Sequence, residues 1–359
     1  MSANPLVGWS LDPSDITLTG TGLRRPECVL AEPSGDLWAA DLGGGAVHIR
    51  PDGSQEVIRP RNGGGPFAPA ENPNIDGNQG FSMPNGLCFD ADGNFVVANF
   101  GTNVVEHLTR DGHWSLIADT VTWPDGSERR IGKANFPAID ADGRLWFSVT
   151  SSAEEWTKRP APLEADGYIA VIDDWRPGTR GVARVVATDL GGTNELRFSA
   201  DGEWLYVAET GDDHMTRYRV EPGGRLTDRQ IYGPERLGGG PDGFAFDAHG
   251  NLWTTLIGQD RLVAITPEGD VVTIWEDGDR ELKAAALASP DDSGVGTVLG
   301  AKPGDGLAPR MASITFGGPD LRTVYIGSLG GTSLPTFTSP VPGAPLPHWT
   351  GQHLRQENS

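Results

Sequence analysis

The sequence predicts an all-β protein folded as a six-bladed β-propeller. Three observations support this: a repeated phrase, the spacing of its copies, and short alternating strands between turn residues. The phrase occurs six times, as PECVLAEPSGDLW from Pro26, PNGLCFDADGNFV from Pro84, ANFPAIDADGRLW from Ala134, TNELRFSADGEWL from Thr193, PDGFAFDAHGNLW from Pro241 and MASITFGGPDLRTVY from Met311. Six copies of one supersecondary unit indicate a repeat architecture.

The spacing and the internal pattern of the copies are typical of propeller blades. The second residues of successive copies lie between 48 and 70 positions apart, in the range of blade repeats. In the fifth copy, an alternating strand around Phe244 and Phe246 is followed by a turn at 247–250, a strand at 251–255, and the strands RLVAIT and DVVTIWE. Four short antiparallel strands make one blade.

The repeats cover residues 24–331, and we expect the whole chain, residues 1–359, to form a single domain with short N-terminal and C-terminal extensions. Its 50 glycines and 28 prolines suit many tight turns, and its 11 tryptophans suit packing between blades. Three insertions, at 61–81, 148–167 and 281–309, interrupt the repeat. Loops of this length are either lids or decoration. We expect 66–78 and 151–162 to border the channel mouth and to help select the substrate.

The second residue of each copy carries the functional signal. The first strand of each blade lines the central channel, so equivalent positions in six blades point at one axis. These residues are Glu27, Asn85, Asn135, Asn194, Asp242 and Ala312. Pro-Asn-Gly and Pro-Asp-Gly are also ordinary turn tripeptides. Asn135 and Asn194 lack the following glycine, however, and Glu27 is a poor turn former, so the set favours a common ligand.

The chemistry of this ring follows from its oxygen donors. Two carboxylates and several amide carbonyls, without His or Cys, form a hard set that suits Ca²⁺ first and Mg²⁺ next, with Mn²⁺, Fe²⁺ or Zn²⁺ as less suitable ions. Zinc held by thiolates is excluded. An ion held by about four side chains keeps open positions for water and substrate, where it polarises a carbonyl or phosphoryl oxygen.

The repeat phrases, the order Glu, Asn, Asn, Asp, and the late phrase ITFGGPDLRTVYIGSLGG resemble the senescence marker protein/gluconolactonase family. This family includes regucalcin, bacterial sugar lactonases and, more distantly, diisopropylfluorophosphatase. The resemblance implies a six-bladed propeller with one divalent ion at the top of the channel. It implies as metal ligands Glu27, Asn135, Asn194 and Asp242.

The resemblance also implies roles toward the substrate. Asp242 falls on the acid that serves the family as general base or nucleophile. Lys133 stands where sugar lactonases often have a substrate-binding arginine, and Asn85 is a further candidate for substrate binding. Phe136 replaces the aspartate that commonly follows Asn135 in the family. This replacement and Lys133 leave the sugar specificity open.

We therefore predict a metal-dependent hydrolase that opens a lactone, with a sugar lactone as the expected substrate. Asp242 activates or orients the attacking water. Alternatively it is only a ligand, since a carboxylate bound to a cation has a depressed pKa, and metal-bound hydroxide attacks. Other functions compatible with the sequence are phosphotriester or aryl ester hydrolysis, a calcium-binding propeller with a structural ion, and a non-hydrolytic cyclase or isomerase.

His214, in AETGDDHMTRY, follows the second strand expected in the fourth blade. It is a candidate proton carrier and substrate contact at the mouth, or else a solvated loop residue. The two cysteines, Cys28 and Cys88, are expected to be free, buried thiols rather than a disulfide, because the chain shows no export signal.

The net charge of −21 disfavours nucleic acid and anionic membranes as partners. The N-terminus has no basic segment followed by an apolar run, and no stretch approaches the roughly 20 apolar residues that span a bilayer. We therefore expect a cytoplasmic protein whose partner is a small lactone or ester.

Overall fold

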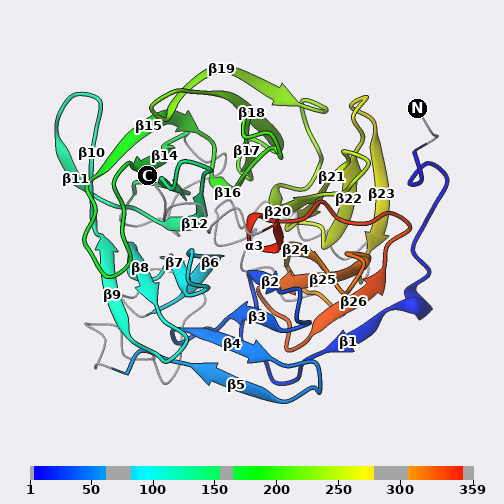
Figure 1. Ribbon diagram of the computed structural model, residues 1–359. Coiled ribbons are helices and arrows are strands. Elements are labelled where there is room, and N and C mark those ends of the chain that lie inside the picture. The colour runs from blue at the N-terminus through cyan, green and yellow to red at the C-terminus, as the bar shows by residue number, and fades with distance from the viewer. Residues whose placement is uncertain (1–3, 62–81, 154–164, 279–305, 351–359) are drawn as a thin grey trace, which may run out of the picture.

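A computed structural model of the protein describes residues 4–61, 82–153, 165–278 and 306–350. Six sheets are arranged around a central axis, with strands β2, β6, β12, β16, β20 and β24 innermost (Figure 1). The predicted all-β, six-bladed propeller is confirmed. None of the helices in the described ranges is long and apolar enough to cross a membrane.

Each repeat phrase forms the two inner strands of a blade. The first blade contains β2 (Val29–Ala31), β3 (Leu37–Ala40), β4 (Ala46–Ile49) and β5 (Gln55–Ile58). The second contains β6 (Pro84–Phe89), β7 (Phe95–Asn99), β8 (Val104–Leu108) and β9 (Trp114–Ala118). The fourth contains β16 (Thr193–Phe198), β17 (Trp204–Glu209), β18 (His214–Glu221) and β19 (Arg225–Tyr232). The fifth contains β20 (Pro241–Phe246), β21 (Leu252–Leu256), β22 (Arg261–Ile265) and β23 (Val271–Glu276).

The third blade is larger than the repeat predicts. Its four regular strands are β12 (Ala134–Ile139), β13 (Leu145–Val149), β14 (Gly167–Ile172) and β15 (Ala183–Leu190). A hairpin of β10 (Thr120–Thr122) and β11 (Glu128–Arg130) extends this sheet, with β10 parallel to β15. Val121 of the hairpin is buried in the blade core, and Arg129 lies over the Trp123 ring. Packing therefore recruits a segment that has no counterpart in the other copies.

The sixth blade closes the ring with both ends of the repeat region. It contains β24 (Met311–Gly317), β25 (Thr323–Ser328), β26 (Leu334–Thr338) and, from the N-terminus, β1 (Thr17–Thr19). β1 pairs antiparallel with β26, and the two lie side by side in Figure 1. A short 3-10 helix, η1 (Pro13–Asp15), precedes β1. The N-terminal extension is thus part of the propeller, although the predicted repeats begin only at residue 24.

A bond between an acidic residue and a tryptophan recurs in the repeat phrase. Trp38, Trp146 and Trp253 are almost fully buried. In these three blades the indole N–H donates to a carboxylate six residues earlier, in the turn between the two inner strands. The acceptors are Glu32 at 2.6 Å, Asp140 at 2.8 Å and Asp247 at 2.8 Å. The bond satisfies the polar atom of a large core side chain, which explains why the two residue types recur at this spacing.

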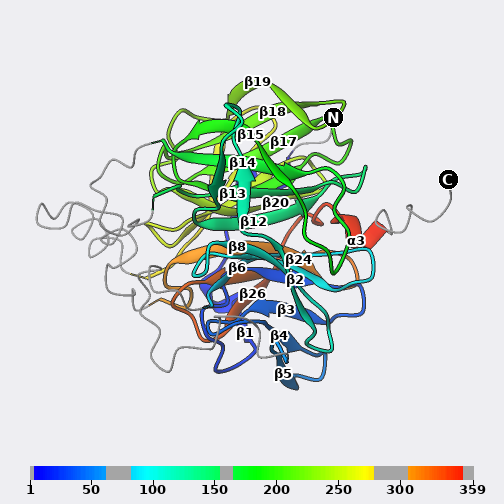
Figure 2. The same cartoon turned by 90° about the vertical axis from the view of Figure 1, so that its left-hand side faces the viewer.

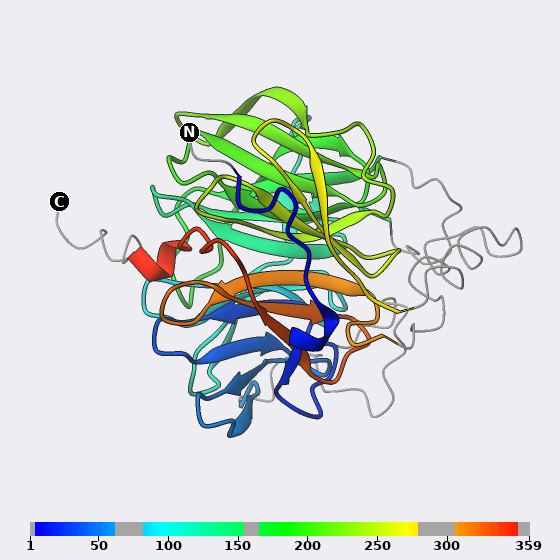
Figure 3. The same cartoon turned by 90° about the vertical axis from the view of Figure 1, so that its right-hand side faces the viewer.

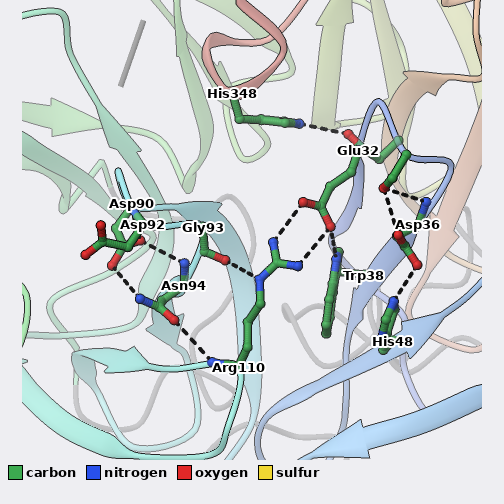
Figure 4. Close-up of polar contacts among 12 residues, drawn as sticks. Glu32, Asp36, Trp38, His48, Asp90, Asp92, Gly93, Asn94, Arg110 and His348 are labelled. Carbon is green, nitrogen blue, oxygen red and sulfur yellow. Dashed lines mark hydrogen bonds and ion pairs between the residues drawn. The ribbon is translucent and has the colours of Figure 1, made fainter. Parts of the chain in front are cut away.

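The C-terminal helix α3 (Pro347–Thr350) lies at one end of the propeller axis (Figures 1, 2 and 3). His348 Nε2 and Trp349 Nε1 are both 2.8 Å from the carbonyl oxygen of Ala31, the last residue of β2. Figure 4 shows this end, where Arg110 joins Glu32 of the first blade. Glu27 precedes the opposite end of β2, so α3 lies at the end of the channel away from the predicted ring.

Two further expectations concern the insertions and the thiols. The insertions at 61–81, 148–167 and 281–309 lie outside the described residues except at their ends, and so do 66–78 and most of 151–162. Cys28 and Cys88 are free, as predicted; Cys28 is buried, whereas Cys88 is partly exposed.

Replacing Thr19 by proline tests how ring closure contributes to stability. Leu18 lies opposite Pro335, which has no N–H, so the hydrogen-bonded pair at this end of β1 is Thr19 with Leu334. Thr19→Pro removes a ladder bond of a three-residue strand, and we expect Tm to fall by about 4 °C or more. Leu18→Pro is the matched control because its N–H points away from β26. Equal Tm values for the two variants would contradict this account of closure.

Candidate functional site

The predicted ring residues lie at irregularities in the innermost strands. The pairing register shifts between Pro84 and Leu87 in β6, and the same shift occurs around Asn135, Asn194, Asp242 and Ala312. A bulge inserts an extra residue and re-aims a side chain, and bulges are frequent beside active sites. Five of the six innermost strands therefore carry a bulge at the ring position, whereas Glu27 lies just before β2.

The glycines after Asn85 and Asp242 serve strand packing rather than turns. Both lie inside strands, β6 and β20. A Cβ at Gly86 would come within 2.7 Å of the Asn135 carbonyl oxygen, and one at Gly243 would come within 2.5 Å of the Ala312 carbonyl oxygen. Neighbouring blades could not approach this closely with a side chain there. The interpretation of these tripeptides as turns is therefore wrong.

Asn85 connects the first two blades and holds Glu27. Its Nδ2 donates to Glu27 Oε1 at 2.9 Å, and its Oδ1 accepts from Arg25 Nη2 at 2.6 Å. Arg25 Nη1 also donates to the Pro84 carbonyl oxygen at 3.0 Å. Both ends of the Asn85 amide are thus engaged by the protein, which favours a positioning role for this residue over the predicted direct contact with substrate.

Two threonines orient the amides of Asn135 and Asn194. Asn135 Nδ2 donates to Thr150 Oγ1 at 2.9 Å, and Thr150 donates its hydroxyl to the Thr193 carbonyl oxygen at 2.9 Å. Asn194 Nδ2 donates in the same way to Thr210 Oγ1 at 3.1 Å. Because each threonine hydrogen is used by a carbonyl of the next blade, the hydroxyl can only accept from the amide. Each Asn therefore directs its oxygen away from its threonine.

Three buried oxygens of the predicted ligands have no hydrogen-bond partner among the described residues. They are Glu27 Oε2, Asn135 Oδ1 and Asp242 Oδ1, and all three residues are at most 4% exposed. Buried polar atoms without partners are rare in native proteins and call for an unseen partner. Acceptors only, two of them from carboxylates, match a hard divalent cation. The donor set therefore fits the predicted metal.

The electrostatics of the ring also favour a cation as the unseen partner of these oxygens. Burial raises the pKa of Glu27 to about 8, against the opposing charge of Arg25. Burial, followed by the charges of Glu27 and Glu195, raises the pKa of Asp242 well above its ordinary value. Glu27 and Asp242 come from the first and fifth blades, so their mutual repulsion also indicates that both face the axis. Like charges so placed are stabilised by a cation between them.

Three charged residues near the ring, Glu195, Arg25 and Arg197, were not predicted from the sequence. Glu195 is buried beside Asn194 in the bulge, and burial raises its pKa to about 7. It pairs with Arg197, whose Nε also donates to the Phe244 carbonyl oxygen at 2.6 Å. The only sequence signal for Glu195 is its charge beside a ring position. Alternation within a regular strand, however, would point its side chain away from the axis. The bulge is what brings it in.

Lys133 is buried at the start of the third blade, with its ammonium 5.6 Å from the centre of the Phe100 ring. Its backbone bonds to Ser151 and Thr150 hold it two residues before Asn135. Burial lowers the pKa of Lys133 to about 8. Its predicted contact with substrate stays a prediction.

His214 lies farther from the axis. It begins β18, two strands out from β16, and its Nε2 is 3.5 Å from Glu209 Oε1. Glu209, Asp212 and His214 place possible ligand atoms within 4.8 Å of one another, which makes them a second possible metal site. The charges that act on His214 belong to Glu209, Asp212 and Arg229. Its predicted role toward substrate also stays a prediction.

The profile of the SMP-30/Gluconolactonase/LRE-like region matches residues 26–292. The chain belongs to this family. A 6-deoxy-6-sulfogluconolactonase of Pseudomonas putida is 27% identical over 220 residues, which cover 61% of this chain and 60% of the relative. Pentonolactonase XacC of Haloferax volcanii is 28% identical over 233 residues, which cover 60% of this chain and 68% of the relative. A solved gluconolactonase of Xanthomonas campestris superposes with a TM-score of 0.58 at 20% identity, covering 91% of this chain and 87% of that one.

Metal addition should separate the two candidate sites. After chelation, Ca²⁺ at about a hundred times its Kd should raise the Tm of the wild type by about 5 °C, because the ion binds only the folded chain. Asp242→Ala should abolish most of this rise. Asp212→Ala is the matched control and should retain it. The reverse pattern would place the ion at Glu209, Asp212 and His214 instead.

The pairing of His214 with Glu209 predicts a measurable pH dependence. The hydrogen bond with Glu209 raises the pKa of His214 above 6.5. Burial alone would raise the pKa of Glu209, but its bonds with His214 and Thr216 and the charge of Arg229 lower it to about 2. The imidazolium therefore contributes stability that is complete below pH 6.5 and is lost as pH rises through the raised pKa. The Glu209 carboxylate contributes stability that is complete above pH 4.5 and is lost as pH falls toward about 2.

An NMR titration of the His214 ring protons should therefore give a pKa above 6.5 in the wild type. Glu209→Gln should lower this value because it removes the carboxylate partner. Glu203→Gln, at an exposed position of the same blade, should leave it unchanged. A wild-type value at or below 6.5 would contradict the pairing.

Proposed function

We propose that this protein is a metal-dependent lactonase that opens the ring of a sugar lactone. The observation that carries the proposal is the set of three buried oxygens without partners, contributed by the first, third and fifth blades. Membership of the gluconolactonase family supports it. So do the names of the two relatives, a sulfogluconolactonase and a pentonolactonase, although the chain spans only 60% of the length of the first.

The residues that would hold the ion are Glu27, Asn135, Asn194 and Asp242. Two carboxylates and two amide oxygens favour Ca²⁺, whose flexible coordination accepts additional water and substrate oxygens. When bound, the ion supplies a Lewis acid that polarises the lactone carbonyl. All other steps of the reaction are assigned to side chains of this protein.

We assign Asp242 the role of general base in this proposal. Its carboxylate accepts a hydrogen bond from Asn194, while Oδ1 has no partner among the described residues. A water oxygen attacks the lactone carbonyl carbon and its proton passes to Asp242. The bond between this carbon and the ring oxygen then breaks, and Asp242 returns the proton to that oxygen, giving the open hydroxy acid. Burial raises the pKa of Asp242 and a bound cation would lower it, so the two effects oppose each other.

The surrounding residues hold this arrangement before substrate arrives. Arg25 and Asn85 position Glu27, whereas Thr150 and Thr210 direct the two Asn oxygens. Because these contacts connect neighbouring blades, ligand positions depend on the closed ring and not on mobile side chains. Preorganised donors of this kind need little rearrangement as charge develops in the reaction.

Asp242→Asn separates coordination from proton transfer. The variant keeps an oxygen ligand of the same size but cannot accept the proton, so we expect retained metal and a fall in kcat of about 10² to 10⁴. Acid release from a panel of sugar lactones, measured by pH-stat, and metal content, measured by atomic spectroscopy, check the two parts. Asp125→Asn, in an exposed turn, is the control and should have wild-type kcat.

The contrary outcomes are also distinct. Wild-type kcat in Asp242→Asn would make Asp242 a ligand only. Hydrolysis of phosphotriesters or aryl esters but of no lactone would show that the protein acts on a different class of substrate. No hydrolysis of any of these by the metal-loaded wild type would overturn the proposal and favour an ion with a structural role.

A further inference from the structure

The turn between β17 and β18, residues 210–213, contacts the strands of two predicted metal ligands. Thr210, at its start, accepts from Asn194 Nδ2 at 3.1 Å and donates its hydroxyl to the Pro241 carbonyl oxygen at 2.6 Å. Pro241 directly precedes Asp242. One turn of the fourth blade, which lies beside β20 in Figure 1, therefore joins the ring residue of its own blade to the segment that leads to the ring residue of the fifth.

The carboxylate at the end of this turn, Asp213, accepts three consecutive backbone N–H groups. Its Oδ2 accepts from Gly238 at 3.0 Å, and its Oδ1 accepts from Gly239 and Gly240, both at 2.9 Å. The Asp213 carbonyl oxygen also accepts from the N–H of Leu237 at 2.8 Å. Successive N–H groups that converge on one anion form a nest. Here the anion is a buried carboxylate of the protein itself, 7% exposed.

The three glycines need this support because they have no side chains that could pack. Gly238 and Gly240 have φ of 79° and 66°, and glycine loses more conformational freedom on folding than any other residue. The carbonyl oxygens of Gly239 and Gly240 accept from residues 257–258 of the fifth blade, each at 3.0 Å. The fifth blade thus holds the carbonyl side of this segment, and Asp213 holds its N–H side.

The position of Asp242 depends on this segment. β20 pairs with β21 at Pro241 and again at Phe244, and the register shifts between these two residues. Asp242 therefore lies in a bulge, where the regular ladder does not fix it. A displacement of residues 238–240 would be passed through Pro241 to the Asp242 carboxylate.

The turn itself does not require a carboxylate. Asp213 has φ of 63° and stands directly before the third strand of its blade. The residues in the same place are Asn103 in the second blade, with φ of 59°, and Gly45 in the first, with φ of 97°. Asn103 Oδ1 has no hydrogen-bond partner among the described residues. The bonds from the fifth blade to Asp213 are therefore additional to a turn that forms without them.

We propose that Asp213 is a positioning residue of the metal site, which fixes Asp242 relative to Asn194 through the backbone of residues 238–240. The inference rests on the proposed binding of a metal ion by these ligands, and it adds a residue that touches neither ion nor substrate. Loss of an outer partner of this kind typically weakens metal binding about 10- to 100-fold.

Replacing Asp213 by glycine removes the carboxylate and keeps the turn, because glycine is natural at φ of 63°. Calorimetric titration of the chelated protein with Ca²⁺, at a temperature where every variant is folded, should give a Kd about 10- to 100-fold higher in Asp213→Gly than in the wild type. Asp213→Asn keeps an oxygen that accepts from Gly239 and Gly240, so it should restore most of the affinity. Loss of stability alone would not change the Kd of the folded protein.

Two control variants complete the design. Asn103→Gly makes the same kind of change at the matching position of the second blade. Arg236→Met removes the exposed guanidinium that lies 3.3 Å from Asp213 Oδ2 and leaves the backbone bonds of Asp213 in place. Both variants should bind Ca²⁺ with the wild-type Kd.

Hydrogen exchange, measured by mass spectrometry, gives a second readout that does not need the metal. In the metal-free protein, peptides that cover residues 238–243 should exchange at least about tenfold faster in Asp213→Gly than in the wild type. Asp213→Asn should restore slow exchange. Peptides around Asn103 should exchange equally in all three proteins.

The contrary results separate this inference from the proposed function. A wild-type Kd in Asp213→Gly would overturn the positioning role and leave the metal site standing. Equal Kd values for Asp213→Asn and Asp213→Gly would also overturn it, because the effect would then come from the negative charge. If the wild type binds no divalent ion, the metal-dependent function fails. Exchange of residues 238–243 then decides the inference: faster exchange in Asp213→Gly supports the fixing of Asp242, and unchanged exchange refutes it.

Discussion

The burial of Glu27 and Asp242 on one axis is the constraint on which the rest of the site depends. Two carboxylates from the first and fifth blades, with Glu195 beside them, repel one another where water cannot screen them. Such an arrangement is stable only with compensating charge, which Arg25 supplies in part. The oxygens of Glu27, Asn135 and Asp242 that lack partners among the described residues mark where further positive charge belongs. Compensation of these charges therefore bears on fold stability as well as on the proposed binding of a metal.

A closed propeller can hold these charged groups close together because each donor is fixed on a different blade. Asn85 joins the first and second blades, and Thr150 and Thr210 join the later ones through backbone carbonyls. Away from the site, bonds between tryptophan and acidic side chains and the helix α3 stabilise the other end of the blades. Because these bonds join neighbouring blades, small changes in blade spacing would displace the predicted ligands together.

The ring position and the position two residues earlier carry different kinds of side chain. Asn85, Asn135, Asn194, Asp242 and Ala312 lie at register shifts of their strands, whereas a cation occupies the position two residues earlier in the first, third and sixth blades. In the first and third blades, a side chain that can accept hydrogen bonds therefore follows a cation by two residues.

The sequence by itself determined the six blades, the strands of the repeat phrase and the residues at the ring positions. These follow from local pattern: strand alternation, turn residues and a repeat that places equivalent residues on one axis. Tertiary structure alone decided the closure of the sixth blade by β1, the added hairpin of the third, and the approach of Arg25 and Glu195 to the ring carboxylates. Closure pairs Thr17 with Thr336, and the bulges interrupt the alternation of side chains that a regular strand would show. Pairing between distant segments and register shifts depend on packing across the whole ring, which no local window of sequence contains.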